Sequence, residues 1–118
     1  MKILIIEDEF LILKTLETFI QKSGHEVDTS RSGRAAIDLL QKNSYDLIIT
    51  DLMLNDISGF DIIEESKKVY SSEEIQQKII VITAYKSDDI INRVKGYGCR
   101  FFEKPFIDVK STIEKMLS

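Results

Sequence analysis

The sequence predicts an α/β fold in which one doubly wound parallel sheet has helices on both faces. Three observations support this. Short apolar runs rich in β-branched residues recur five times, stretches of helical periodicity separate them, and the alternation fills all 118 residues. Strands that alternate with helices form right-handed βα units, which build a covered parallel sheet. The length fits one domain, residues 1–118.

The strand predictions rest on apolar runs that do not alternate with polar residues. Leu47–Ile49 and Ile79–Ile82 are uninterrupted runs of this kind. Strands that are buried on both faces of a sheet have this pattern. The predicted strands are Lys2–Ile6, Glu26–Ser30, Asp46–Thr50, Lys78–Thr83 and Arg100–Glu103.

Between these runs, apolar residues recur at helical spacing and capping residues mark the ends. In the first stretch Leu16 and Ile20 share one face, and Gly24 follows where a glycine commonly ends a helix. Ser71–Gln77 is polar and is predicted to be a loop with an extra turn. The predicted helices are Glu9–Ser23, Ser32–Lys42, Gly59–Tyr70, Ser87 or Asp88 to Lys95, and Ile107–Leu117.

Composition excludes several classes of protein. Apolar residues make up 43% and charged residues 31%, which excludes disordered and fibrous chains. A net charge of −4 without a Lys/Arg run argues against direct contact with nucleic acid. No apolar stretch is long enough for membrane insertion. The single cysteine, Cys99, allows no intrachain disulfide. We therefore expect a small soluble domain of the cytoplasm.

Charged and hydroxyl side chains follow four of the predicted strands. Glu7 and Asp8 come after the first strand, Asp51 after the third, Thr83 ends the fourth, and Lys104 follows the fifth. In an open parallel sheet, ligands bind at the carboxyl ends of the strands. We therefore expect three carboxylates, one hydroxyl and one ammonium to meet at one edge of the sheet.

Three neighbouring carboxylates repel one another, and a divalent cation removes that repulsion. Oxygen ligands suit Mg²⁺, with Mn²⁺ as the alternative, and Mg²⁺ readily shares its coordination sphere with phosphate. An aspartate in such a site can accept a phosphoryl group, because aspartyl phosphates are a known covalent form. Thr83 and Lys104 would then hold the remaining phosphate oxygens.

Four different motifs follow one another along essentially the whole chain. They are Glu7-Asp8 after the first strand, Asp51 with Gly59 eight residues on, Thr83-Ala84, and Phe101 before Lys104-Pro105-Phe106. Each motif alone is weak, but together they resemble a response-regulator receiver domain of two-component signalling, of the stand-alone single-domain type. The resemblance implies a five-stranded (βα)5 flavodoxin-like sheet with strand order 2-1-3-4-5.

The resemblance also implies a role for each site residue. A histidine kinase or a histidine phosphotransfer protein donates a phosphoryl group to Asp51, and Thr83 and Lys104 contact that group. The chain then has no enzyme activity beyond this self-catalysed transfer and a slow autodephosphorylation. The implied Mg²⁺ ligands are Glu7, Asp8, Asp51 and the backbone carbonyl of Met53.

A phosphorylation switch is implied as well. Movement of Thr83 frees space for Phe101 to rotate inward, which shifts a two-state equilibrium on the face of the fourth helix, fifth strand and fifth helix. Because no effector domain follows, the expected output is contact with other proteins. It would be a phosphorelay step, phosphorylation-dependent binding of a target, or a phosphorylation-linked dimer. The chain could also be a receiver fragment of a larger regulator.

Several residues depart from the family's pattern. Glu7 replaces the commoner aspartate, and Asn55 stands where proline is usual, which predicts a more mobile loop after Asp51. Phe101 lacks the hydroxyl of a tyrosine. The resemblance also implies a cis peptide bond between Lys104 and Pro105, as X–Pro chemistry permits.

The lifetime of an aspartyl phosphate depends on access of water. In the family, the side chains two residues after the aspartate and two after the threonine flank the approach of that water. Here they are Met53 and Tyr85, which are bulky and poorly suited to orient water. We therefore predict slow self-dephosphorylation.

Three other functions fit the predicted fold. A haloacid-dehalogenase-like phosphatase needs a second acid where Met53 stands, and a flavodoxin-like cofactor site after the first strand would suffer repulsion from Glu7–Glu9. A folded pseudo-receiver scaffold that is never phosphorylated stays open. For single residues, the alternatives are a helix-dipole role for Glu7–Glu9, a loop cap for Asp51, a solvated lysine for Lys104 and an ordinary strand residue for Thr83.

Three further residues received predictions of their own. His25 is expected to be a surface or turn residue on the edge opposite the carboxylates, and Cys99 a small core residue. The first predicted helix has more apolar residues than one inward-facing stripe needs, and Leu11 is the additional one. Leu11 either packs on a neighbouring element or stays exposed, together with an edge of Ile12, to dock a partner helix.

Overall fold

The computed structural model describes residues 1–85 and 87–118 and contains a five-stranded parallel sheet in the order β2-β1-β3-β4-β5. This order confirms the doubly wound, flavodoxin-like prediction. The strands are β1 (Lys2–Ile6), β2 (Glu26–Ser30), β3 (Leu47–Asp51), β4 (Ile79–Thr83) and β5 (Arg100–Glu103).

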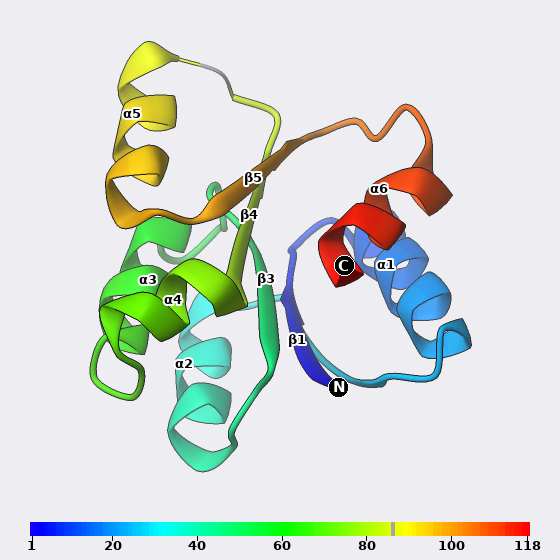
Figure 1. Cartoon of the computed structure of the whole chain (residues 1–118), viewed down its shortest axis with the longest axis horizontal. Coiled ribbons are helices and arrows are strands. Elements are labelled where there is room, and N and C mark those ends of the chain that lie inside the picture. Colours follow the sequence, from blue (N-terminus) through cyan, green and yellow to red (C-terminus); the bar gives the residue numbers. More distant parts are fainter. Residues whose placement is uncertain (86) are drawn as a thin grey trace.

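Helices cover both faces of this sheet (Figure 1). The helices are α1 (Phe10–Lys22), α2 (Gly33–Lys42), α3 (Gly59–Ser66), α4 (Ser72–Lys78), α5 (Asp88–Tyr97) and α6 (Val109–Leu117). α1 and α6 pack on one face, and the other helices pack on the opposite face. Within the described residues, no helix is long and apolar enough to cross a membrane.

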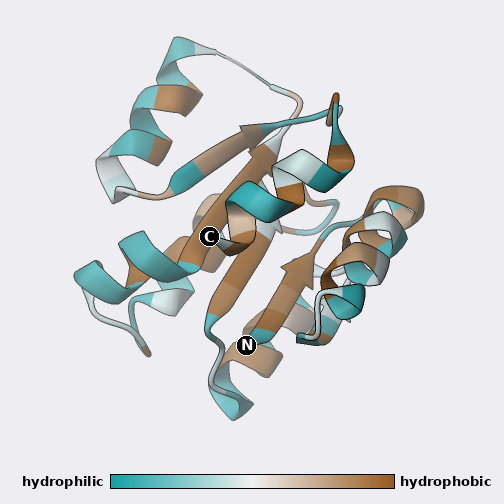
Figure 2. Ribbon diagram, turned by 45° about the vertical axis from the view of Figure 1, so that its right-hand side comes forward, coloured by the Kyte–Doolittle hydropathy of each residue, from teal (hydrophilic) through white to brown (hydrophobic). Residues whose placement is uncertain are grey.

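The central strands supply most of the core. β3 and β4 are buried along their whole length, and so are all residues of β1 except Lys2. Figure 2 shows these strands as mostly apolar, whereas the helices carry polar residues on their outer sides. Apolar side chains on alternate positions of each strand contribute to two separate core clusters, one on each face of the sheet.

The described residues hold six helices where five were predicted. Ser71–Gln77, predicted to be a loop with an extra turn, is largely the helix α4. Its start is fixed by a capping box, in which the Ser71 hydroxyl accepts from the Glu74 N–H and the Glu74 carboxylate accepts from the Ser71 N–H. The prediction overlooked this Ser-x-x-Glu signal because the segment carries little apolar periodicity.

Some predicted helix ends were also wrong. α3 ends at Ser66 instead of Tyr70, and Val69, which lies within the predicted range, is outside the helix and exposed. α6 begins at Val109 because the Asp108 side chain accepts from the Ser111 N–H and caps the helix, which leaves Ile107 outside it and fully exposed. The other element bounds differ from the predictions by two residues at most.

Candidate functional site

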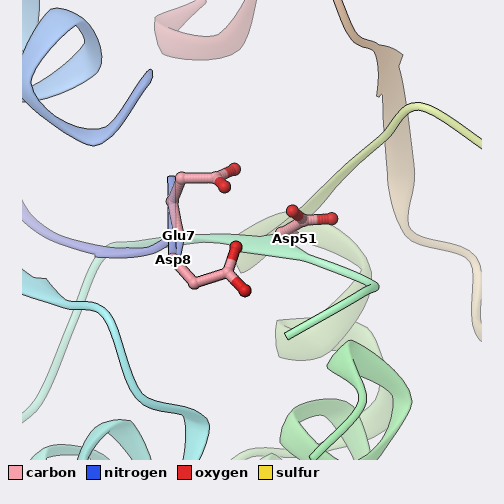
Figure 3. A group of neighbouring side chains, drawn as sticks. All are labelled: Glu7, Asp8 and Asp51. Carbon is pink, nitrogen blue, oxygen red and sulfur yellow. The ribbon is translucent and has the colours of Figure 1, made fainter. Parts of the chain in front are cut away.

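Three acidic side chains meet at the carboxyl ends of β1 and β3. Glu7 and Asp8 follow β1, and Asp51 ends β3, which lies beside β1 in the sheet. One carboxylate oxygen of each lies within 4.8 Å of the others. Figure 3 shows the three carboxyl groups directed into the same region. Glu7 and Asp51 are buried and Asp8 is half-buried, so the predicted convergence of the acids is confirmed.

Gly59 allows α3 to begin directly against Asp51. Its N–H donates to the carbonyl of Leu52 at 2.8 Å. A Cβ atom at this position would stand 2.5 Å from the Asp51 carbonyl oxygen and 2.9 Å from the Leu52 Cα. Only glycine tolerates this approach, which explains the glycine eight residues after the aspartate.

Lys104 places one ammonium group among the acids. Its Nζ donates to Asp51 Oδ2 at 2.7 Å and to Glu7 Oε2 at 3.1 Å. The Lys104 N–H donates to the Thr83 carbonyl at 2.9 Å, and the peptide bond to Pro105 is cis, as the resemblance implied. The side chain is 6% exposed, so the reading of Lys104 as a solvated loop residue is wrong.

Burial and crowding perturb both partners of this ion pair. Burial, followed by the negative charge of Asp51, raises the pKa of Glu7 to about 7. Burial would lower the pKa of Lys104, but its hydrogen bonds and charge interactions with Asp51 and Glu7 raise it above its usual value. One ammonium therefore does not fully compensate the acids, which is the electrostatic setting that a divalent cation relieves.

A cavity of about 340 Å³ opens beside these groups. Met53 and Tyr85 stand at its rim with 51% and 57% of their surface exposed, at the positions predicted to flank an approaching water. Thr83 is buried at the end of β4, where its hydroxyl accepts from the Tyr85 N–H at 3.0 Å. The lining residues are Asp8, Glu9, Asp51, Met53, Asn55, Ala84, Tyr85 and Lys104.

Two charged residues contact the site in ways that were not predicted from the sequence. Glu9 is the N-cap residue of α1, yet its side chain makes no cap hydrogen bond and instead pairs with Lys104 Nζ at 3.4 Å. Arg31, in the loop after β2, donates from Nε and Nη2 to the Asp8 carbonyl at 3.2 and 3.0 Å. Glu9 could have been suspected from its place after the acid pair, whereas no local signal marks Arg31.

The remaining predictions concern residues outside the acidic pocket. Phe101 is half-buried on β5 and packs against the core cluster that contains Val81, its register partner on β4. His25 lies before β2, away from the acids, where Nδ1 is 2.9 Å from the Met1 amino group. Cys99 is buried, which raises its pKa to about 11. The predictions for His25 and Cys99 are therefore confirmed.

Leu11 settles one alternative that the sequence left open. It is 79% exposed, so the interpretation that it packs on a neighbouring element is wrong. Together with Ile12, Pro105, Phe106 and other residues, it lines an apolar groove of about 190 Å³ between α1 and the start of α6. Lys104 lines both this groove and the acidic cavity, so the two are neighbours.

The donor set fits a hard divalent cation. All three candidate ligands offer carboxylate oxygens, and none of the described groups of neighbouring potential ligands contains histidine or cysteine. Oxygen-only sites favour Mg²⁺ over zinc or copper. The cavity that Asp8 and Asp51 line leaves room for waters and for a phosphoryl group, whereas Glu7 is fully buried behind it.

Comparison with known proteins agrees with this geometry. The response regulator receiver domain model matches residues 3–116. The polar-differentiation response regulator DivK of Brucella ovis is 31% identical over 117 residues, which cover 98% of this chain and 93% of the relative. A further DivK, from Brucella anthropi, is 29% identical over the same shares of the two chains.

Solved structures show the same arrangement of elements. CheY4 of Vibrio cholerae, a chemotaxis response regulator, superposes with a TM-score of 0.80 at 28% identity and covers 98% of this chain and 94% of its own. The non-phosphorylated HemR receiver domain of Leptospira biflexa gives 0.84 at 27% identity, covering 99% and 94%. Because the receiver domain model matches nearly the whole chain and a DivK relative is 31% identical to it, this chain belongs to the response regulator receiver domain family of two-component signalling.

Proposed function

We propose that the chain accepts a phosphoryl group from a phosphohistidine onto Asp51. The donor is a histidine kinase or a histidine phosphotransfer protein. A carboxylate oxygen of Asp51 attacks phosphorus, the P–N bond breaks, and its electron pair remains on the imidazole nitrogen. The observation that carries this proposal is the contact of Asp51 with Lys104 at 2.7 Å beside an open acidic cavity. An aspartate with a cation at hand is a competent phosphoryl acceptor.

The proposed reaction depends on Mg²⁺, with Mn²⁺ as the alternative ion. Glu7, Asp8 and Asp51 would hold the cation together with the backbone carbonyl of Met53, a ligand set supported by the clustered carboxylates. When bound, the cation would offset the charge of the acids and of the incoming phosphoryl oxygens. Lys104 would then release Asp51 Oδ2 and hold a phosphoryl oxygen instead.

The response to phosphorylation is proposed to run from Thr83 to Phe101. The new phosphoryl group adds charge and hydrogen-bond acceptors, which would draw the Thr83 hydroxyl away from the Tyr85 N–H. Thr83 and Phe101 lie on the same face of neighbouring strands, two positions apart in the register of β4 and β5. Space vacated by Thr83 is therefore within reach of the Phe101 ring, which would rotate inward.

The apolar groove beside the acidic cavity supports the proposal that a protein partner docks there. Leu11 exposes a large apolar side chain in this groove, which Lys104 and Pro105 also line. We propose that a helix of the phosphodonor protein docks there and brings its phosphohistidine over Asp51. Downstream targets and a phosphorylation-linked dimer would use the face of α5, β5 and α6 instead. A cytoplasmic site of action stays a prediction.

Incubation with acetyl phosphate and Mg²⁺, followed by intact mass measurement, tests the proposed function. We expect the wild type to gain one phosphoryl group and Asp51→Asn to gain none. Asp38→Asn is the matched control, because Asp38 is an exposed aspartate of α2 and its loss changes the charge equally. A wild type that stays unmodified with Mg²⁺ present, or equal modification of Asp51→Asn, would instead favour the pseudo-receiver scaffold or another acceptor.

A further inference from the structure

Asp56 joins the loop after β3 to the start of α2. Its Oδ1 accepts from the Gly33 N–H at 3.0 Å and from the Ile57 N–H at 3.0 Å. Its Oδ2 accepts from the Ser32 hydroxyl at 2.9 Å and from the Arg34 N–H at 3.0 Å. Ser32 is the N-cap residue of α2, so one carboxylate satisfies donors of the helix start and of its own loop.

Packing holds the same two segments together. Gly33, the first residue of α2, lies under the side chains of Ile57 and Leu54. A Cβ atom at Gly33 would stand 2.4 Å from Ile57 Cγ1 and 3.1 Å from Leu54 Cδ1. The loop therefore fits onto α2 through an apolar contact that is independent of the Asp56 hydrogen bonds.

The base of this loop belongs to the acidic pocket. The Met53 N–H donates to Asp51 Oδ1 at 3.1 Å, and Met53 pairs with Ser58 across an isolated antiparallel bridge. Met53 and Asn55 both line the cavity. The loop is thus closed at its base beside Asp51 and attached at Asp56 to α2, with the pocket-lining residues between these two points.

We infer that Asp56 is a positioning residue for the phosphoryl-transfer site, because it holds the loop that presents the Met53 backbone and Asn55 to the acidic pocket. Proline is usual at position 55, and the asparagine here led to the prediction of a more mobile loop. The attachment at Asp56 supplies a restraint of another kind. The inference rests on the proposed function, in which the Met53 carbonyl is a cation ligand.

The ionisation state of Asp56 agrees with this role. Hydrogen bonds from the N–H groups of Arg34 and Gly33 hold the pKa of Asp56 well below its usual value. The carboxylate is therefore charged whenever the protein is near neutral pH, and all four of its hydrogen bonds are charge-assisted.

Asp56→Ala and Asp56→Asn test the inference against Ser71→Ala. Ser71 caps α4 as Ser32 caps α2, but α4 contributes nothing to the acidic pocket. Calorimetric titration with MgCl₂ alone gives the first measurement. We expect Asp56→Ala to weaken Mg²⁺ binding about threefold to tenfold, below the roughly 10- to 100-fold effect of removing a direct partner of a metal ligand. Ser71→Ala should leave Mg²⁺ binding unchanged.

Two further readouts separate positioning from a general loss of stability. Amide hydrogen exchange should quicken in residues 52–58 and at the start of α2 in Asp56→Ala, while the core strands stay protected. Asp56→Asn keeps one acceptor oxygen and should give intermediate values for both exchange and Mg²⁺ binding. With acetyl phosphate, the Mg²⁺ concentration for half-maximal rate should rise while the rate at saturating Mg²⁺ is retained.

The outcomes distinguish failure of the inference from failure of the proposed function. Equal Mg²⁺ affinity of wild type, Asp56→Ala and Ser71→Ala would overturn the inference even if Asp51 is phosphorylated. If Asp56→Ala does not fold, Asp56→Asn decides, and wild-type affinity in that variant together with unchanged exchange at residues 52–58 overturns the inference. A wild type that binds Mg²⁺ but accepts no phosphoryl group would overturn the proposed function alone.

Discussion

The two ends of the sheet differ in how the charges of their buried polar groups are balanced. Near the amino ends of β1, β3 and β4, the buried Tyr45 donates from its hydroxyl to Asp28 at 2.7 Å and from its N–H to the Tyr70 hydroxyl at 2.9 Å. Lys78 Nζ donates to the Tyr45 carbonyl at 2.8 Å. This amino end is closed by the chain's own donors and acceptors.

At the carboxyl end, Glu7, Asp8 and Asp51 face one another with Lys104 as the ammonium between them. Every buried polar side-chain atom in the described part of the chain has a hydrogen-bond partner, so the contrast concerns charge and not lost hydrogen bonds. The comparison teaches that this fold separates stability from ligand binding. One end is complete without a ligand, and we propose that the other is completed by a cation.

The largest expected effect follows from opening the amino end. Tyr45→Ala removes a buried ring and its hydroxyl, so we expect a loss of about 4 kcal/mol in the free energy of unfolding. Urea unfolding with and without Mg²⁺ measures it. Mg²⁺ should raise the stability of Tyr45→Ala and wild type by equal amounts, because this end binds no cation. Specific rescue of Tyr45→Ala by Mg²⁺ would break the proposed separation of the two ends.

Removal of the ammonium from the carboxyl end should behave differently. Lys104→Ala leaves buried carboxylates without a counter-charge, and we expect a loss of about 3 kcal/mol without Mg²⁺. Saturating Mg²⁺ should restore at least half of this loss. Lys78→Ala is the matched lysine control at the amino end, and its smaller loss should be insensitive to Mg²⁺. Equal Mg²⁺ responses of the two variants would contradict the comparison.

The raised pKa of Glu7 predicts a pH dependence confined to the carboxyl end. The folded state binds a proton on Glu7 up to a pH of about 7, whereas the unfolded chain releases it near 4.5. The stability due to this proton is therefore full below pH 4.5 and is lost as pH rises through about 7, by an amount on the order of 3 kcal/mol.

Chemical unfolding across this pH range checks the sign. Glu7→Gln carries no titrating proton, so its stability should lack this decline. Asp8, Glu9, Asp51 and Lys104 surround Glu7 in both proteins and are common to the comparison. Saturating Mg²⁺ should also remove the decline from the wild type, because a bound cation keeps Glu7 ionised. Parallel pH profiles of wild type and variant would rule out the assignment to Glu7.

The smallest effect concerns the rim of the charged end. Met53 and Tyr85 present bulky side chains where water would approach the phosphoryl group, so the aspartyl phosphate should decay slowly. The double variant Met53→Asn and Tyr85→Glu should speed decay about tenfold, equivalent to about 1.4 kcal/mol in the barrier. Intact mass measurement over time, which follows loss of the phosphoryl group, gives the decay rate. Unchanged or slower decay in the double variant would refute this role.

The sheet and the acids at its edge were predictable because they depend on short-range signals. Uninterrupted apolar runs such as Ile79–Ile82 locate buried strands. Parallel strands bring their carboxyl ends to one edge of the sheet irrespective of loop conformation. Glu7, Asp8, Asp51 and Lys104 therefore met as predicted.

Other features depend on the path of loops and on side-chain directions, which no periodicity records. Asp56, in the loop after β3, accepts a hydrogen bond from the start of α2. Arg31, in the loop after β2, donates to the Asp8 carbonyl. Glu9 turns away from its own helix toward Lys104. The helix α4 was missed for another reason, because its Ser71–Glu74 capping box is a polar signal in a segment without an apolar stripe.

A crystal structure with Mg²⁺ and beryllofluoride tests the central claim most directly, because it probes the cation site and the phosphoryl acceptor together. We predict beryllium bonded to an Asp51 carboxylate oxygen, Mg²⁺ among Glu7, Asp8 and Asp51, and Lys104 Nζ turned from Asp51 to a fluorine atom. An adduct on another residue, or a pocket that stays empty while its acids point into separate regions of solvent, would contradict the account.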